Sequence, residues 1–238
     1  MRIRRFALAT TLVAALGVLA APAALADAPT ATYEITITNL TDGQWMTPPA
    51  AATHNRSFDI YDVRRPASEA VQQLAENGNL APLTSAFDAS SAVSDWTVAI
   101  ADPDLPPLAP GGSVTFTLEG DRGARHLSFA SMLICTNDGF TGIDGLKLPR
   151  NMGNTLTGYT RAYDAGTEIN TEAWADLVPP CAQLTGFGDQ GGTGASNPDL
   201  AEDGVIKRHR GIGGIADLVP GIHGWHGAVA KIEVTRVG

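Results

Sequence analysis

Strict alternation of apolar and polar residues is the feature that most constrains how this chain of 238 residues can fold. From 32 to 38, Tyr33, Ile35 and Ile37 would lie on one face of an extended strand, with threonine and glutamate on the other. This period of two is typical of an antiparallel strand that buries one face. The alternation recurs at 96–100, 114–118 and 230–235, and a more continuously apolar run at 127–134 predicts a central strand.

One segment has the spacing of a helix instead. Pro66 suits a first helical position, apolar residues including Val71 and Leu74 recur at helical intervals, and Gly78 supplies a stop. We therefore expect a helix over 66–77 that buries Val71 and Leu74. Gly-, Pro-, Asp- and Asn-rich stretches, especially 185–198 and 207–225, predict long loops. The fold class expected is all-β, an antiparallel β-sandwich with one short helix and long decorated loops.

The first 26 residues have the pattern of a secretory signal. Three arginines within the first five positions precede an apolar run over 6–21, and Ala24-Leu25-Ala26 has small residues at both positions that a signal peptidase recognises. A retained membrane anchor is the alternative, but the run is short for a span. We expect 1–26 to be removed, leaving one domain over 27–238, secreted or periplasmic, with no membrane span.

The chain is acidic. Its formal charge is −9 with only 16 Lys and Arg, and loss of the three signal arginines would lower the charge to −12. This balance argues against electrostatic capture of nucleic acid and favours cations or basic surfaces as partners. The sequence has no phosphate-binding loop, dinucleotide fingerprint or EF-hand loop.

The two cysteines have only each other as partners within the chain. An oxidising compartment would favour a disulfide between Cys135 and Cys181, and two buried free thiols are the alternative. Closing a loop between cysteines 46 positions apart would stabilise the fold by about 4 kcal/mol in the chain-entropy model. The cysteines lack the Cys-x-x-Cys spacing of a thiol redox site.

Three ordered segments resemble the spondin N-terminal domain, the module of F-spondin and mindin. They are 127–148, the Tyr-Asp-Ala-Gly-Thr sequence at 163–167, and a histidine, short strand and helix over 54–79. The family's Pro-Ser-Pro-Asp-Trp is replaced here by Cys135 to Gly139, and 185–225 has no clear counterpart. Within the first segment, the matching positions are Asp138, Phe140, Gly142, Asp144, Leu146 and Leu148.

The resemblance implies a β-sandwich similar to calcium-dependent phospholipid-binding domains, with a metal ion held by loops at one end. Glu119 ends a predicted strand, Asp138 follows the next one, and Asp164 starts the Asp-Ala-Gly-Thr turn. Their spacing resembles that of the family's acidic positions. We expect these three to converge and hold Ca²⁺, because calcium prefers oxygen ligands gathered from several loops. Asp144 is a further candidate ligand, and each acid taken singly could instead form or cap a turn.

Other candidate sites have weaker patterns. His223 and His226 have metal-ligand spacing, but nothing in the sequence supplies a third ligand, which favours loop or core roles. His209 lies in a basic Lys-Arg-His-Arg stretch that suggests a solvated loop. His54 could cap or buttress the helix, and Ser131 lacks the Gly-x-Ser-x-Gly pattern of a serine hydrolase.

These observations lead to one main functional hypothesis and two alternatives. The main one is a secreted, non-catalytic, calcium-binding module for adhesion or extracellular recognition, whose partner would be an extracellular protein or glycan. The first alternative is a secreted metal-dependent hydrolase that uses Asp138, Asp164 and a histidine. The second is a structural, envelope-associated protein. The all-oxygen ligand set favours calcium over a catalytic zinc ion.

Overall fold

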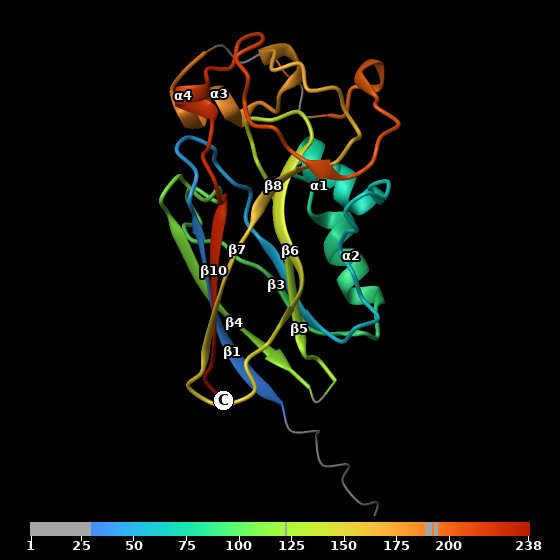
Figure 1. Ribbon diagram of the computed structural model, residues 1–238, viewed down its shortest axis with the longest axis vertical. Helices are drawn as coiled ribbons and strands as arrows, with labels where there is room; N and C mark the ends of the chain where they lie inside the picture. Colours follow the sequence, from blue (N-terminus) through green and yellow to red (C-terminus); the bar gives the residue numbers. More distant parts are fainter. Residues whose placement is uncertain (1–29, 122, 189–191, 193–194) are drawn as a thin grey trace, which may run out of the picture.

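Two antiparallel sheets face each other along the length of the molecule (Figure 1). The computed structural model describes residues 30–121, 123–188, 192 and 195–238. The predicted signal, 1–26, lies outside these ranges. Among the described residues, no helix has the length and apolar character needed to cross a membrane.

The smaller sheet contains four strands, all paired antiparallel. Its two central strands are the first and the last that the structure describes, and they pair from Tyr33 with Arg236 to Asn39 with Ala230. In spatial order the strands are β4 (Ser113–Gly120), β1 (Ala31–Asn39), β10 (Ala230–Arg236) and β7 (Thr155–Tyr159).

The larger sheet contains six strands, also antiparallel throughout. Its central strand β5 is buried at every residue, as the continuous apolar run predicts. In spatial order the strands are β3 (Val93–Val98), β2 (Ala50–His54), β5 (His126–Met132), β6 (Gly139–Lys147), β8 (Arg161–Asp164) and β9 (Lys207–Arg208).

The space between the sheets is filled by the apolar faces that the alternation predicts. Tyr33, Ile35 and Ile37 of β1 are buried and form one cluster with Phe129 of β5 and Ile232 of β10. The intervening threonines of β1 face outward, where Thr36 hydrogen bonds Thr115 of β4. The predicted all-β sandwich is therefore confirmed.

The outer face of the larger sheet is covered by helices α1 (Glu69–Asn77) and α2 (Ala81–Ala89) (Figure 1). Helix α1 begins three residues after the predicted Pro66, because the Ser68 side chain accepts a hydrogen bond from Val71 N–H and caps the helix. It ends at Gly78, whose φ of 65° suits glycine. Val71 and Leu74 are buried against the sheet, as predicted.

Helix α2 is an addition to the single helix expected. It begins at Ala81, the N-cap residue Leu80 offers no side-chain hydrogen bond, and Pro82 in the first turn is its local start signal. Leu83 and Phe87, four residues apart, lie on one face and are buried against the sheet. Packing of these two side chains against neighbouring elements therefore adds to the local signals at its start, where Asn79 Oδ1 accepts from Ala81 N–H.

Beyond one end of the strands, the segments 165–188 and 195–229 form what we call the loop region (Figure 1). The C-terminus lies at the opposite end of the sandwich. Short helical segments interrupt the loop region, and they are η1 (Trp174–Asp176), α3 (Pro180–Thr185), η2 (Pro198–Leu200) and α4 (Pro220–His223).

Candidate acidic site at the loop region

Two of the predicted acids meet where the larger sheet joins the loop region. Asp138 directly precedes β6, and the first residue of that strand, Gly139, pairs with Asp164 at the end of β8. The main-chain N–H of Ala165 also donates to the carbonyl of Asp138. The strand register therefore brings Asp138 and Asp164 together although they are far apart in sequence.

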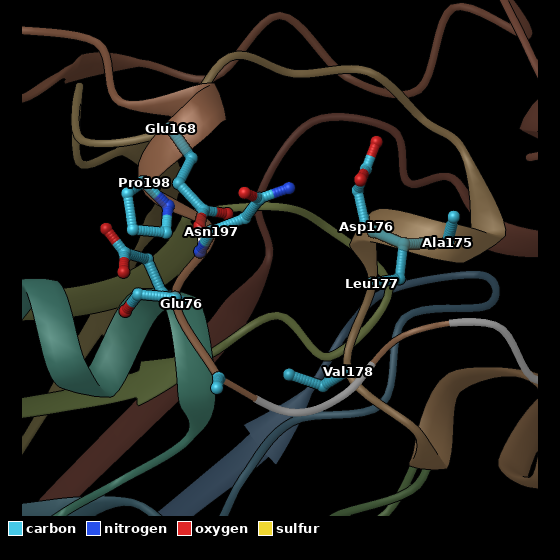
Figure 2. A pocket seen from close by; sticks show the side chains of 10 residues that line it. Glu76, Glu168, Ala175, Asp176, Leu177, Val178, Asn197 and Pro198 are labelled. Atoms are coloured by element: carbon cyan, nitrogen blue, oxygen red, sulfur yellow. Dashed lines mark hydrogen bonds between the residues drawn. The ribbon is translucent and has the colours of Figure 1, made fainter.

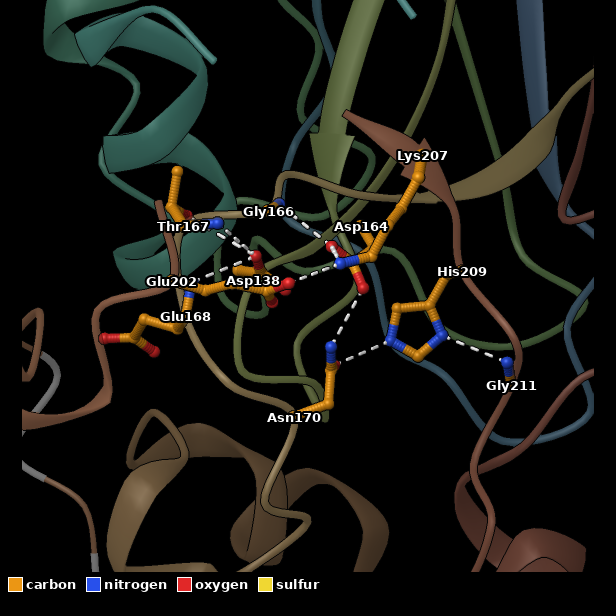
Figure 3. A network of polar contacts seen from close by, with 10 residues as sticks. All are labelled: Asp138, Asp164, Gly166, Thr167, Glu168, Asn170, Glu202, Lys207, His209 and Gly211. Atoms are coloured by element: carbon orange, nitrogen blue, oxygen red, sulfur yellow. Dashed lines mark hydrogen bonds and ion pairs between the residues drawn. The ribbon is translucent and has the colours of Figure 1, made fainter. Parts of the chain in front are cut away.

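The Asp138 carboxylate is fully buried, and among the described residues only one of its two oxygens has hydrogen-bond partners. Its Oδ2 accepts hydrogen bonds from the main-chain N–H groups of Thr167, at 2.8 Å, and Glu168, at 3.2 Å (Figure 3). Its Oδ1 has no hydrogen-bond partner among the described residues. Burial, followed by repulsion from Asp164, raises the pKa of Asp138 to about 6, although the two N–H donors oppose the rise.

The Asp164 carboxylate is buried too, but both of its oxygens have partners. Oδ1 accepts from the main-chain N–H of Gly166 at 2.9 Å and lies 3.4 Å from the Lys207 ammonium, which also pairs with Glu202 (Figure 3). Oδ2 accepts from the Asn170 amide at 2.9 Å. Lys207 therefore supplies part of the positive charge that this acidic region requires.

The Asp-Ala-Gly-Thr turn requires its glycine. Gly166 has a φ of 70°, which favours glycine over other residues. A Cβ at this position would also lie 2.6 Å from the main-chain N and O of Val205. The close approach of 204–206 to this turn leads the chain into β9, which carries Lys207 to Asp164.

Three acids, Glu76, Glu168 and Asp176, line a pocket of about 280 Å³ (Figure 2). Glu168 connects this pocket to the acidic pair, because its main-chain N–H donates to Asp138. Glu168 accepts a hydrogen bond from Asn197 N–H at 2.8 Å, and burial together with the charges of Glu76, Asp138 and Asp176 raises its pKa to about 7. Glu76 comes from helix α1 and has one buried oxygen without a partner among the described residues. Sequence reasoning missed Glu76 and Glu168, although Glu168 directly follows the Asp-Ala-Gly-Thr turn.

The prediction that Glu119 joins Asp138 and Asp164 is wrong. Glu119 pairs with Thr32 near the start of β1, and its carbonyl accepts a hydrogen bond from Thr53, beside the start of β5. Since successive antiparallel strands end at opposite ends of a sheet, β4 ends away from the loop region. The side chain is also exposed, because Leu118 takes the inward position.

Asp144 does not join the acidic site either. It lies within β6, where its Oδ1 accepts from Ile60 N–H at 3.0 Å and from the Ser128 hydroxyl at 2.8 Å. Ser128 in turn contacts His54 Nε2 at 2.7 Å. Burial raises the pKa of Asp144, and these hydrogen bonds oppose the rise. His54 does not cap helix α1, which Ser68 caps.

The chain of His54, Ser128 and Asp144 differs from a hydrolytic triad. In such a triad the histidine lies between the serine and the acid, so that it can take the serine proton. Here the serine lies in the middle, fully buried, and also accepts a hydrogen bond from Gly145 N–H. The arrangement is suited to joining strands β2, β5 and β6.

The other histidines have separate positions. His223 is fully buried beside Trp174 and Phe187, whereas the His226 side chain is 92% exposed and pairs with Asp42. The His-x-x-His spacing thus forms no shared site. His209 is buried rather than solvated, which corrects the expectation from its basic neighbours.

No set of three or more His, Cys, Asp or Glu side chains within the described ranges is arranged to hold a metal ion. The four predicted ligands therefore reduce to the pair Asp138 and Asp164, with Glu168 nearby. The predicted disulfide is confirmed, with Cys135 and Cys181 bonded at 2.04 Å. It attaches helix α3 of the loop region to the segment between β5 and β6.

Comparison with known proteins identifies the family. The family model Spondin_N matches residues 38–173, which is more than half of the chain and includes both Asp138 and Asp164. A search against curated proteins gave no match. The confirmed disulfide and the two-sheet architecture agree with the secreted type of protein that this family represents. The chain therefore belongs to the Spondin_N family of extracellular recognition modules.

Proposed function

We propose that this chain is a secreted, non-catalytic module that binds a calcium ion beside Asp138 and uses the loop region for adhesion or recognition of an extracellular protein or glycan. The observation that carries the proposal is the Spondin_N match, which includes both members of the buried acidic pair. Fold likeness alone would not assign a partner.

The residues near Asp138 suit a hard cation. Asp138 has a buried oxygen without a partner in the described structure, and repulsion between it and Asp164 disfavours the ionised form. A cation placed among such carboxylates would relieve this repulsion. Asp138 and Asp164 are the carboxylates that would contribute to a calcium site, and main-chain carbonyls or water would have to supply the rest of its six to eight oxygen ligands.

Non-catalytic function is supported by the position of the Ser–His–Asp grouping found among the described residues. His54, Ser128 and Asp144 lie inside the larger sheet, and the serine has no histidine placed to act as its base with the acid behind it. The secreted location is supported by the disulfide, because such bonds persist in oxidising compartments.

Calcium binding is tested on the mature protein by elemental analysis and thermal melting, with calcium and with EDTA. Calcium should raise the melting temperature of the wild type, because a ligand that binds only the folded state stabilises it. Asp138→Ala should lose this rise, whereas Glu119→Ala, at the other end of the sandwich, should keep it. Absence of any calcium response in the wild type would contradict the proposal.

Recognition is tested separately by adding labelled mature protein to intact cells of the producing organism and measuring the fraction that stays on their outer surface after washing. We expect saturable retention that unlabelled protein displaces. Retention that never saturates would contradict a recognition role.

A further inference from the structure

A second pocket in the loop region has a basic character that contrasts with the acidic chain. Its volume is about 530 Å³, and it lies where the short edge strand β9 meets the segment 225–227. The lining side chains that matter here are Arg161, Arg208, Arg210, Trp225 and His226. Except for Arg161, these residues lie outside the part of the chain that the Spondin_N model matches.

The alternation of strand β9 creates the basic wall. Successive residues of a strand face opposite sides, so Lys207 turns toward Asp164 while Arg208 is left exposed. The next residue, His209, is buried, and Arg210 is exposed again. Arg161, at the start of the adjoining strand β8, is also exposed and lines the same pocket.

A buried histidine positions the aromatic wall. The His209 ring lies 5.2 Å from the Trp225 ring, measured between centroids. His209 Nδ1 accepts from Gly211 N–H at 3.0 Å, so the other nitrogen, Nε2, donates to Asn170 Oδ1 at 3.0 Å (Figure 3). Both ring nitrogens are thus engaged, and burial lowers the pKa of His209, which favours the neutral ring. Trp225 also packs on the core between the sheets.

Among the described residues, the three arginines of this pocket have no acidic side chain as a partner. Within the described parts of the chain, Lys207 pairs with Asp164 and Glu202, and His226 pairs with Asp42, but the guanidinium groups of Arg161, Arg208 and Arg210 form no ion pair or hydrogen bond. Unpaired guanidinium groups gathered in one concave site are suited to carboxylate or sulfate groups of a ligand, which they bind in a bidentate manner.

We propose that this pocket binds a short segment of an anionic glycan, with a sugar ring against Trp225 and its acidic groups on Arg208 and Arg210. The inference rests on the recognition function proposed above and specifies its ligand class. An aromatic ring beside charged donors suits a sugar ring, which is apolar on its face and polar at its edge. The pocket volume suits a few rings, and the chain's charge of −9 disfavours long polyanions such as nucleic acid.

Isothermal titration calorimetry of the mature protein tests the proposal with four probes: a polyuronate hexasaccharide, a sulfated heparin hexasaccharide, neutral maltohexaose and a single-stranded hexanucleotide. We expect binding of at least one acidic hexasaccharide and none of maltohexaose. The two acidic probes distinguish carboxylate from sulfate as the preferred group. Tighter binding of the oligonucleotide than of both acidic sugars would overturn the proposal.

Two double variants distinguish glycan binding in this pocket from a general effect of the protein's net charge. Arg208→Gln with Arg210→Gln should weaken glycan binding about tenfold or more, because each removes charge-assisted hydrogen bonds. The matched control is Arg56→Gln with Arg150→Gln, which loses the same charge in a pocket of about 440 Å³ beside His126 and Lys147, at the other end of the larger sheet. Equal weakening by the two double variants would overturn the proposal.

Trp225→Phe and Trp225→Ala test the sugar contact. Affinity should fall in the order wild type, Phe, Ala, and equal affinity of all three would overturn the stacking geometry. Cell-surface retention distinguishes a failure of the pocket assignment from a failure of the proposed recognition function. If neither acidic glycan binds but retention persists unchanged in the Arg208 and Arg210 variant, the pocket assignment is overturned while the recognition function stands.

Discussion

Replacing Asp138 with asparagine should stabilise the metal-free protein at neutral and alkaline pH. Asparagine keeps an oxygen that can accept from Thr167 and Glu168 N–H, but it removes a charge that is fully buried beside Asp164. The pKa of Asp138 rises from 3.8 to about 6, so the folded state disfavours the ionised carboxylate. This net change already includes the two opposing N–H hydrogen bonds.

The size of the effect follows from the difference between the ordinary pKa of aspartate and that of Asp138 in the folded protein. This difference of about two pH units corresponds to about 3 kcal/mol of unfolding free energy. Because the folded pKa is the higher one, Asp138 disfavours folding increasingly as the pH rises from about 4 to about 6. The gain in unfolding free energy from Asp138→Asn should therefore be about 3 kcal/mol at pH 8 and about half of that at pH 5.

Urea unfolding followed by tryptophan fluorescence, in EDTA at constant ionic strength, measures this difference at both pH values. Asp203→Asn, which removes an exposed carboxylate, is the control and should leave the unfolding free energy nearly unchanged at either pH. If Asp138→Asn destabilises the protein by the same amount at pH 5 and pH 8, hydrogen bonding rather than charge repulsion governs this site, and the reasoning fails.

Three other changes test the packing. Replacing Cys135 and Cys181 with alanine should lower the unfolding free energy by about 4 kcal/mol, since the bond closes a loop of 46 residues, and an unchanged urea midpoint would contradict this. Leu74→Ala should cost about 2–5 kcal/mol in the same assay, and a loss below about 1 kcal/mol would mean that helix α1 packs loosely. Ser128→Ala should cost about 1–3 kcal/mol, because it leaves Gly145 N–H without its acceptor, and an intact amide-exchange protection at Gly145 would contradict this.

The sequence predicted those elements whose signals are local. Strands β1, β4 and β10 bury one face and so alternate, and α1 has a capping serine and a terminal glycine. Strand β2, with the sequence Ala-Ala-Ala-Thr-His, is buried at all five positions and has no alternation that could reveal it. Helix α2 likewise depends on tertiary contacts of Leu83 and Phe87.

For the candidate site, the sequence predicted the pair but not its surroundings. Asp138 and Asp164 follow strands that run in the same direction, so they reach the same end of the sheet. Glu119 lies near the end of a strand that runs the other way, and the alternating direction of the consecutive strands predicted at 114–118 and 127–134 could have indicated this. Glu76 comes from a helix packed beside the sheet, and no pattern within the strands could indicate that it reaches the pocket.

The place of β10 in the smaller sheet determines when this sheet can finish folding. This strand, residues 230–236, lies between β1 and β7 and provides the inner neighbour of both. While the chain is being synthesised, β1 emerges among the first described segments, yet one of its two edges has no partner until nearly 200 further residues have followed. The smaller sheet thus cannot be completed until β10 has emerged, because the inner edges of both β1 and β7 need this one late strand.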